Sequence, residues 1–396
     1  MAQRITAARL VVMRTIAVLL SAAALTLGVA PTAAASDLPP LDPDALAASI
    51  AGLPDGEASG AILQVLGSDG RWQGTAGVAD VRTGRPVPQN GRFRIGSMTK
   101  AFTATAALQL VARGKLRLDR SVQSYVPGVL PASYPDITVD QLLDYTSGLP
   151  GIDIDHKDPT WFLAHRFDAW TPRQLFDLAF WDERRQVKPM LFAPGAKQHY
   201  GNIDYLVLGA VIEKVTGRPY GDAIRAGIIR PLHLGATTVP GRDTRIHGPH
   251  ARGYEETDGS FVDITDANPT FQWAAAEMIS NAPDLDRFLV ALMSGRLLPP
   301  AQTALLFDMP EVALYDGDAD PANDQDAYLG HGLARLAVGP YVFWGKTGDR
   351  PGYNNGMAAT KDLTRRAVFS ANTLHMGGAE QPKVAQRIVA AVTGLA

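Results

Sequence analysis

The chain has 396 residues, of which 46% are hydrophobic and 19% charged, and its formal net charge is −3. This length allows two ordinary domains or one large one. The mild negative charge, with no stripe of Lys and Arg, disfavours a nucleic-acid partner because phosphate binding requires clustered cations, and the absence of cysteine excludes disulfides, thiolate zinc sites and cysteine nucleophiles.

The first 35 residues have the pattern of a secretory signal peptide. Three arginines precede the apolar run of residues 16–25, and the small residues 33–35 follow it. Segments of these kinds in this order are typical of a leader that is removed, and no later apolar run is long enough to span a bilayer. We therefore expect cleavage near Ala35 and a soluble protein that is secreted to the extracellular or cell-wall space, without membrane association. An uncleaved N-terminal anchor is the alternative.

The next part of the chain has strand patterns followed by one long helix. A short helix is expected over residues 45–51, and residues 61–66 and 71–78 have the composition of a strand pair joined by a turn. Residues 92–95 form a further short strand. They lead into a run of good helix formers that extends to a suitable C-cap at Gly114.

The middle of the chain is predicted to be mainly helical. Strand signals become rare between about residues 118 and 253, where helices are expected at residues 139–145, 171–180 and 203–215. Prolines and aromatic residues between these helices indicate packed, irregular loops.

Strand patterns return in the last part of the chain. The elements expected there are a helix at 285–293, strands at 333–338, 341–345, 356–360 and 366–372, and a final helix at 383–392. This order predicts an α+β fold, in which an antiparallel sheet flanked by helices is built from both ends of the chain and a mainly helical subdomain is inserted between them. We expect an α/β subdomain of residues 36–115 and 270–396, a helical subdomain of residues 116–269, and a site in the cleft between them.

A candidate nucleophile lies at the start of the long helix, in the sequence Arg94-Ile95-Gly96-Ser97-Met98-Thr99-Lys100. Gly96 permits a tight turn, and Ser97 and Lys100 are spaced to lie on the same face of a helix. A serine hydroxyl becomes an effective nucleophile when a base lies within hydrogen-bond distance, and a lysine whose pKa is lowered by burial can be that base. Alone, the pattern also fits an N-cap serine beside a solvated lysine.

Two further motifs occur at defined structural positions. Tyr200-Gly201-Asn202 directly precedes the helix expected from residue 203, and Lys346-Thr347-Gly348 lies on or directly after the strand expected at residues 341–345. Each motif alone has an ordinary explanation, such as a buried tyrosine, an N-cap asparagine or an edge-strand lysine. Their joint presence, in this order, predicts one site built from three separated segments.

These three motifs resemble those of the penicillin-recognising serine hydrolases, in the branch that holds class C β-lactamases and the secreted actinobacterial D-alanyl-D-alanine carboxypeptidases. That branch combines S-x-x-K and Y-x-N with a strand that carries Lys or His before Thr-Gly. Nearly the whole mature chain takes part in the resemblance. Further similar segments are residues 92–97, 114–119, 142–149, 208–217 and 231–235.

The resemblance implies catalytic roles for three residues. Ser97 would attack a carbonyl carbon and form an acyl-enzyme, and Lys100 would hold or receive its proton. Tyr200 would pass that proton to the leaving nitrogen. Because a phenol has a high ordinary pKa, positive charge from Lys100 and Lys346 would be needed beside it.

The resemblance also implies how substrate is held. Asn202 would orient the substrate amide, and the Lys346-Thr347-Gly348 strand would bind a substrate carboxylate through Lys346 and Thr347. The backbone N–H groups of Ser97 and Asp349 would form the oxyanion hole.

Two positions depart from the pattern of the family, and the place of two aromatic residues stays open. The carboxypeptidases have histidine where this chain has Lys346, and a small or hydroxyl residue is usual where it has Asp349. A carboxylate at position 349 is unfavourable beside a developing oxyanion or a substrate carboxylate, although Arg350 could neutralise it. The resemblance also implies an aromatic side chain that lines the cleft near residue 273. Trp273 is therefore expected to be a substrate-binding residue, with a core position as the alternative, and the same choice applies to Phe271.

The sequence thus predicts a secreted serine D-alanyl-D-alanine carboxypeptidase that forms an acyl-serine with peptidoglycan-type peptides and is acylated by β-lactams. The alternatives are a class C-like β-lactamase, and an esterase or D-amino-acid amidase of the same fold, which Asp349 favours. A wall-binding module with a vestigial site is disfavoured because Ser97, Lys100 and Tyr200 are all retained. No cofactor and no metal site are implied, and a monomer is expected.

Overall fold

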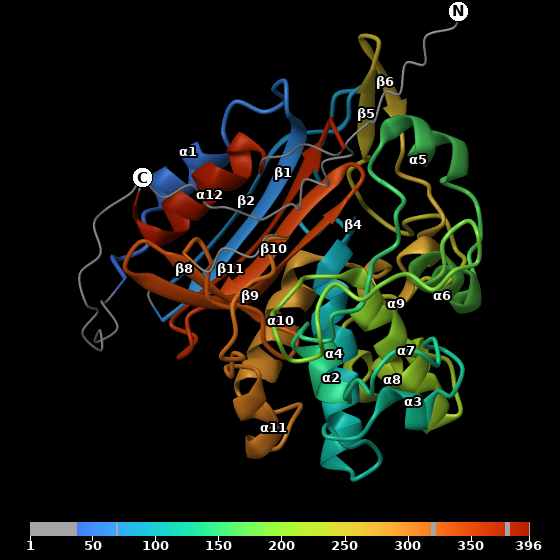
Figure 1. Ribbon diagram of the computed structural model, residues 1–396. Coiled ribbons are helices and arrows are strands. Elements are labelled where there is room, and N and C mark those ends of the chain that lie inside the picture. Colours follow the sequence, from blue (N-terminus) through green and yellow to red (C-terminus); the bar gives the residue numbers. More distant parts are fainter. Residues whose placement is uncertain (1–37, 69, 318–321, 377–380, 396) are drawn as a thin grey trace, which may run out of the picture.

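The computed structural model describes residues 38–68, 70–317, 322–376 and 381–395 (Figure 1). The predicted signal peptide lies outside these residues. Among the helices that the structure describes, none is both long and apolar enough to cross a membrane.

The main sheet is built from both ends of the chain. In the described residues it has seven strands in the order β3-β2-β1-β11-β10-β9-β8, and neighbouring strands are antiparallel. The strands are β1 (Ala58–Gly67), β2 (Gly70–Asp80), β3 (Arg85–Pro86), β8 (Ala334–Val338), β9 (Tyr341–Arg350), β10 (Tyr353–Ala359) and β11 (Arg365–Thr373). Strand β1 joins the two parts because it pairs with β2 on one side and with β11 on the other.

Helices cover both faces of this sheet (Figure 1). On one face, α1 (Pro43–Ile50) and α12 (Lys383–Thr393) bury apolar side chains against β1 and β11. On the other face lie α2 (Thr99–Ala112) and α10 (Ala282–Met293), which take part in the larger hydrophobic core. The candidate nucleophile is therefore attached to a helix that packs between the sheet and the helical part of the molecule.

The remaining elements form the helical part and its connections. The helices are α3 (Val122–Tyr125), α4 (Val139–Leu143), α5 (Pro159–His165), α6 (Pro172–Phe180), α7 (Asn202–Thr216), α8 (Tyr220–Ile224), α9 (Trp273–Ala276) and α11 (Pro300–Leu305). The short helical turns are η1 (Gly96–Met98), η2 (Arg225–Ile229) and η3 (Pro269–Phe271). Two small strand pairs are β4 (Phe93–Arg94) with β7 (Ile279–Ser280), and β5 (Tyr254–Thr257) with β6 (Ser260–Asp263).

Helix α2 is buried on nearly all sides. Twelve of its 14 residues are buried, as expected for a helix with little amphipathic pattern. Its polar side chains are satisfied by neighbouring backbone: Thr103 donates to the carbonyl of Ala274 (2.8 Å), and Gln109 donates to that of Gly227 (3.0 Å). Because buried polar groups without partners are costly, these bonds fix α2 against α9 and η2.

The predicted α+β fold class, with an antiparallel sheet and an inserted helical part, is confirmed. The proposed subdomain boundaries remain a prediction. The β5–β6 hairpin and α11 were not expected, and β10 begins at Tyr353 rather than at residue 356. Asn354 and Asn355 disfavour strand structure in isolation, but in the sheet they pair opposite Asp349 and Gly348 of β9.

Candidate active site

The turn that carries Ser97 is held rigidly at the edge of the sheet. Gly96 has φ +55, and a Cβ atom there would lie 2.6 Å from the backbone nitrogen of Asp349. Only glycine fits a position with both a left-handed conformation and so close a neighbour. The N–H of Ile95 donates to Met278 (3.0 Å), which anchors the turn on the opposite side. Ser97 then opens the path into α2 through η1.

Lys100 is fully buried and lies within hydrogen-bond distance of the nucleophile. Its Nζ donates to Ser97 Oγ (3.1 Å), to Asn202 Oδ1 (2.6 Å) and to the carbonyl of Ala275 (3.2 Å). Burial lowers the pKa of Lys100 well below its usual range, the nearby charge of Lys346 lowers it further, and Asp204 opposes this. A lysine with a lowered pKa beside a serine hydroxyl can accept its proton.

Tyr200 lies between two cations. Its ring centroid is 4.9 Å from Lys100 Nζ and 4.6 Å from Lys346 Nζ. Burial raises the pKa of the Tyr200 hydroxyl above its ordinary value, a hydrogen bond with Ser97 lowers it, and Asp349 raises it again. Because 37% of the residue is exposed, solvent moderates this increase. Lys346, and Lys100 once it has taken up a proton, can stabilise a transient phenolate.

Lys346 is the second lysine beside Tyr200. It comes from β9 and is buried, and this burial lowers its pKa to about 8. Its Nζ contacts its neighbour's carbonyl, Thr347 O, at 3.4 Å. The structure thus brings Ser97, Lys100, Tyr200 and Lys346 together, although they come from three separated segments of the chain.

Strand β9 runs directly against the Ser97 turn. A Cβ atom on Gly348 would lie 1.9 Å from the carbonyl oxygen of Ile95, so only glycine permits this approach. Asn355, which the sequence did not single out, ties the two segments by donating to the carbonyls of Arg94 (2.9 Å) and Gly348 (3.1 Å). This packing sets the backbone of Asp349 beside that of Ser97, where an oxyanion hole is expected.

The side chain of Asp349 forms an ion pair that the sequence did not predict. Its Oδ2 accepts a hydrogen bond from Lys157 Nζ. Lys157 lies in the loop that precedes α5, 192 positions away in the chain. The side chain of Asp349 is 42% exposed and that of Lys157 22%. Arg350, the neutralising partner expected from the sequence, is buried.

Asn202 is the first residue of α7 and has two partners inside the protein. Its Oδ1 accepts from Lys100, and its Nδ2 donates to Gln272 Oε1 (3.0 Å). The side chain thereby orients Lys100. Contact between Asn202 and a substrate amide stays a prediction. In such a contact, the substrate would share the Nδ2 group of Asn202 with Gln272.

Trp273 departs from its expected place in the cleft. Its ring packs edge-on against Tyr220 (5.2 Å between centroids) and comes close to Gly209, so the structure favours the core alternative. The other aromatic residue considered, Phe271, instead contacts Trp161 (5.2 Å) and His156 (5.7 Å). The rings of Phe271 and Trp273 are only two residues apart in sequence. They face different surroundings because η3 ends and α9 begins between them.

A buried carboxyl group behind the site was not predicted. Asp204 accepts a hydrogen bond from Ser147 (2.5 Å), and burial raises its pKa to about 8. Tyr145, held in the left-handed region (φ 63), packs at a tilt against Tyr200 (5.1 Å between ring centroids) and stacks on Tyr205 (5.2 Å). These residues support Tyr200 and the electrostatics of Lys100. In the sequence, Asp204 and Tyr205 lie close to the Tyr200 motif, and Tyr145 and Ser147 lie in the similar segment 142–149, but their spacing does not mark them as a group.

Glu277 gives a prediction for stability. It is buried, and Tyr220 donates a hydrogen bond to it. Burial raises its pKa from 4.5 to about 7, and Tyr220 and Arg225 oppose the increase. The folded state therefore holds this proton more tightly than the unfolded state, so the free energy of unfolding falls as pH rises from about 4.5 to about 7. Glu277→Gln should abolish roughly 3 kcal/mol of this fall.

The measurement is chemical denaturation of both proteins at pH 5 and pH 8. We expect Glu277→Gln to gain stability relative to wild type as pH rises. Asp204 contributes a fall of the same sign in both proteins, so the difference between them isolates Glu277. Parallel curves for the two proteins would show that residue 277 keeps an ordinary pKa.

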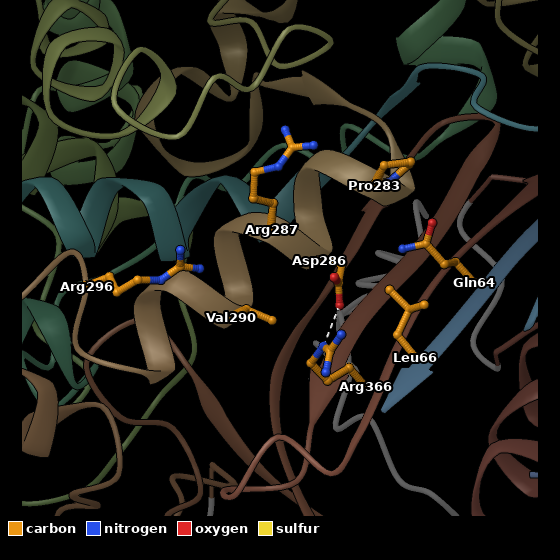
Figure 2. Close-up of a pocket in the computed structure, with 8 residues that line it drawn as sticks. All are labelled: Gln64, Leu66, Pro283, Asp286, Arg287, Val290, Arg296 and Arg366. Carbon is orange, nitrogen blue, oxygen red and sulfur yellow. Dashed lines mark hydrogen bonds and ion pairs between the residues drawn. The ribbon is translucent and has the colours of Figure 1, made fainter. Parts of the chain in front are cut away.

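The described residues contain no group of three or more His, Cys, Asp or Glu side chains placed to hold a metal ion. A cavity of about 370 Å³ opens between α10 and strands β1 and β11 (Figure 2). Arg366 and Asp286 form an ion pair there (2.7 Å), but none of the predicted site residues lines it. The candidate active site is thus the separate arrangement around Ser97.

This arrangement is suited to acyl transfer. It combines a nucleophile, a buried amine in contact with it, a phenol between two cations and a backbone position for the oxyanion. Proton transfer between Ser97, Lys100 and Tyr200 requires no large movement, because their side chains are already in contact.

Comparisons with known proteins agree with this chemistry. The chain is 36% identical over 162 residues to esterase EstB of Burkholderia gladioli, and this aligned region covers 40% of this chain and 41% of the esterase. It is 28% identical over 312 residues to penicillin-binding protein 4 of Amycolatopsis lactamdurans, and this aligned region covers 71% of this chain and 77% of that protein. The similarity to EstB thus extends over less than half of the length of the esterase.

A solved structure is similar over most of the chain. The D-stereospecific amidohydrolase from a Streptomyces species superposes with a TM-score of 0.75 at 33% identity, covering 88% of this chain and 98% of that one. The family profile described as Beta-lactamase matches residues 46–391. The chain therefore belongs to the β-lactamase family of penicillin-recognising serine hydrolases.

Proposed function

We propose that the protein hydrolyses amide bonds on the carbonyl side of a D-amino acid through an acyl-Ser97 intermediate. The observation that carries this proposal is the contact between buried Lys100 and Ser97 (3.1 Å), with Tyr200 held between Lys100 and Lys346. Stereospecificity for the D-configuration is supported by the similarity to the Streptomyces amidohydrolase. With the expected signal peptide, the activity would lie outside the cell.

The proposed reaction has two balanced stages. Ser97 Oγ forms a bond to the carbonyl carbon, and its proton moves to Lys100 or Tyr200. The carbon–nitrogen bond then breaks, and the leaving amine takes up that proton through Tyr200. In the second stage, water adds to the acyl-serine and gives a proton to the same residues, which return it to Ser97 Oγ as the acid departs.

A D-alanyl-D-alanine carboxypeptidase is the second candidate within this class. Lys346 and Thr347, whose position in β9 is that expected for binding a substrate carboxylate, favour it. Asp349 opposes it, because a second carboxylate beside the site repels that group. Acylation by β-lactams is compatible with either candidate, and rapid release of the acyl group would make the protein a β-lactamase.

A substrate panel tests the proposal. The compounds are D- and L-phenylalanine amide, an N-acyl-D-Ala-D-Ala peptide, p-nitrophenyl acetate and nitrocefin. We expect the D-amide to be hydrolysed at least about 100-fold faster than the L-amide, because only one configuration places the carbonyl in the oxyanion hole while its α-substituents fit the cleft. Fast, steady turnover of nitrocefin without amide hydrolysis would overturn the proposal in favour of a β-lactamase. Ester hydrolysis alone would indicate an esterase.

A further inference from the structure

The geometry points to Asp349 as the residue that recognises a free α-ammonium group on the substrate. The substrate class is then D-amino-acid amides and peptides with an unblocked D-amino acid at the N-terminus. This inference rests on the proposed function and refines it. It predicts discrimination against acyl groups that lack the positive charge, including N-acylated wall peptides.

The first support is the position of Asp349 relative to the reacting carbonyl. Its backbone lies against the turn that carries Ser97. When its N–H binds the oxyanion, the substrate carbonyl oxygen is about 3 Å from that nitrogen. The α-nitrogen of an aminoacyl group is only two bonds from the carbonyl carbon. The ammonium group and the Asp349 carboxylate are therefore within reach of each other without rearrangement of β9.

The second support is that the carboxylate is exposed and already holds a cation. Lys157 reaches it from the loop before α5 and binds Oδ2. Oδ1 has no hydrogen-bond partner in the part of the chain that the structure describes. An ionised carboxylate accepts several hydrogen bonds, so a substrate ammonium can bind Oδ1 while Lys157 orients the group through Oδ2.

The third support is electrostatic. The charge of Asp349 acts on the catalytic centre itself, since it raises the pKa of Tyr200. A negative charge placed there opposes formation of the oxyanion and of a phenolate, which is a cost for catalysis. A substrate ammonium that pairs with Asp349 removes this cost. A neutral acyl group leaves it in place, so the same charge provides selectivity.

The test compares two substrates that differ in charge but hardly in size. D-phenylalanine amide carries an α-ammonium, and D-phenyllactamide carries a hydroxyl in its place; N-acetyl-D-phenylalanine amide is the blocked substrate. At pH 7 an ordinary α-amino group is mostly protonated. We expect wild type to prefer the free amine by about 10- to 100-fold in kcat/KM, the range for one charge-assisted hydrogen bond.

Asp349→Asn should remove this preference by lowering kcat/KM for the free amine and raising it for the two neutral substrates, because the backbone N–H is kept while the opposing charge is lost. Asp119→Asn is the matched control, since it breaks an exposed ion pair with Arg117 (2.7 Å) at the other end of α2. In Lys157→Met the carboxylate remains, so the preference should persist. If Lys157→Met lost the preference for the free amine as completely as Asp349→Asn, the preference would depend on the loop that carries Lys157. That result would overturn the inference.

The inference and the proposed function fail differently. If wild type hydrolyses D-amides over L-amides but treats the amine, hydroxyl and acetylated substrates alike, the proposed function stands and the role of Asp349 is wrong. If none of the D-amides is hydrolysed while nitrocefin or the ester is, the proposed function is wrong and the inference falls with it.

Discussion

Ser97→Ala is expected to lower kcat/KM for D-phenylalanine amide by at least about 10⁴-fold, because no acyl-enzyme can form without the hydroxyl. The residual rate would come from the oxyanion position and substrate binding alone. Folding should be preserved, since the hydroxyl is a single polar group at the start of η1. The matched control is Ser133→Ala, which removes an exposed hydroxyl outside the site.

The measurement is steady-state hydrolysis together with thermal unfolding of both variants. Ser133→Ala should match wild type in both. The assignment of Ser97 as nucleophile would be wrong if Ser97→Ala kept more than about a hundredth of the wild-type rate, because loss of a nucleophile lowers the rate by much more than 100-fold.

Lys100→Met is the second change with a large expected effect. We expect kcat/KM to fall about 10²- to 10⁴-fold, the usual contribution of a positioned acid–base group. Stability should change little or increase, because methionine fills a similar volume and the cost of a buried charge disappears. The pKa of Lys100 is lowered chiefly by that same burial, so catalytic competence and destabilisation have one cause.

The matched control is Lys115→Met, which replaces an exposed lysine just beyond the end of α2. Activity and unfolding temperature of this variant should stay at the wild-type values. A Lys100→Met protein that is clearly less stable than wild type, with activity lost only in proportion to its unfolded fraction, would make Lys100 a structural residue instead.

The sequence was most informative where local chemistry determines the structure. Gly96, Ser97 and Lys100 are consecutive parts of one turn and helix, so their spacing alone predicted contact, and the structure gives 3.1 Å between Lys100 and Ser97. The strand that carries Lys346 was likewise marked by its own composition. Resemblance supplied the step that spacing cannot give, namely that Tyr200 and Lys346 meet at this turn.

Features that depend on packing between distant segments were not predictable from the sequence. Lys157 meets Asp349 only because the loop before α5 lies over β9, and Asn355 acts through the register of β10. The sequence predicts Trp273 in the cleft, but Gln272 both ends η3 and precedes α9, and a small change of backbone direction there decides which side a ring faces. Burial of Asp204 follows from the packing of α7 and carries no signature of its own.

The proposed mechanism depends above all on a covalent bond between the substrate acyl group and Ser97. The most direct test is rapid acid quenching of the protein with a reactive D-phenylalanine ester, and in parallel with a penicillin, followed by intact-protein mass spectrometry and peptide mapping. We expect one acyl group per chain, located on Ser97 and absent from Ser97→Ala. An adduct on another residue, or turnover of the ester with no adduct at any quench time, would contradict the account.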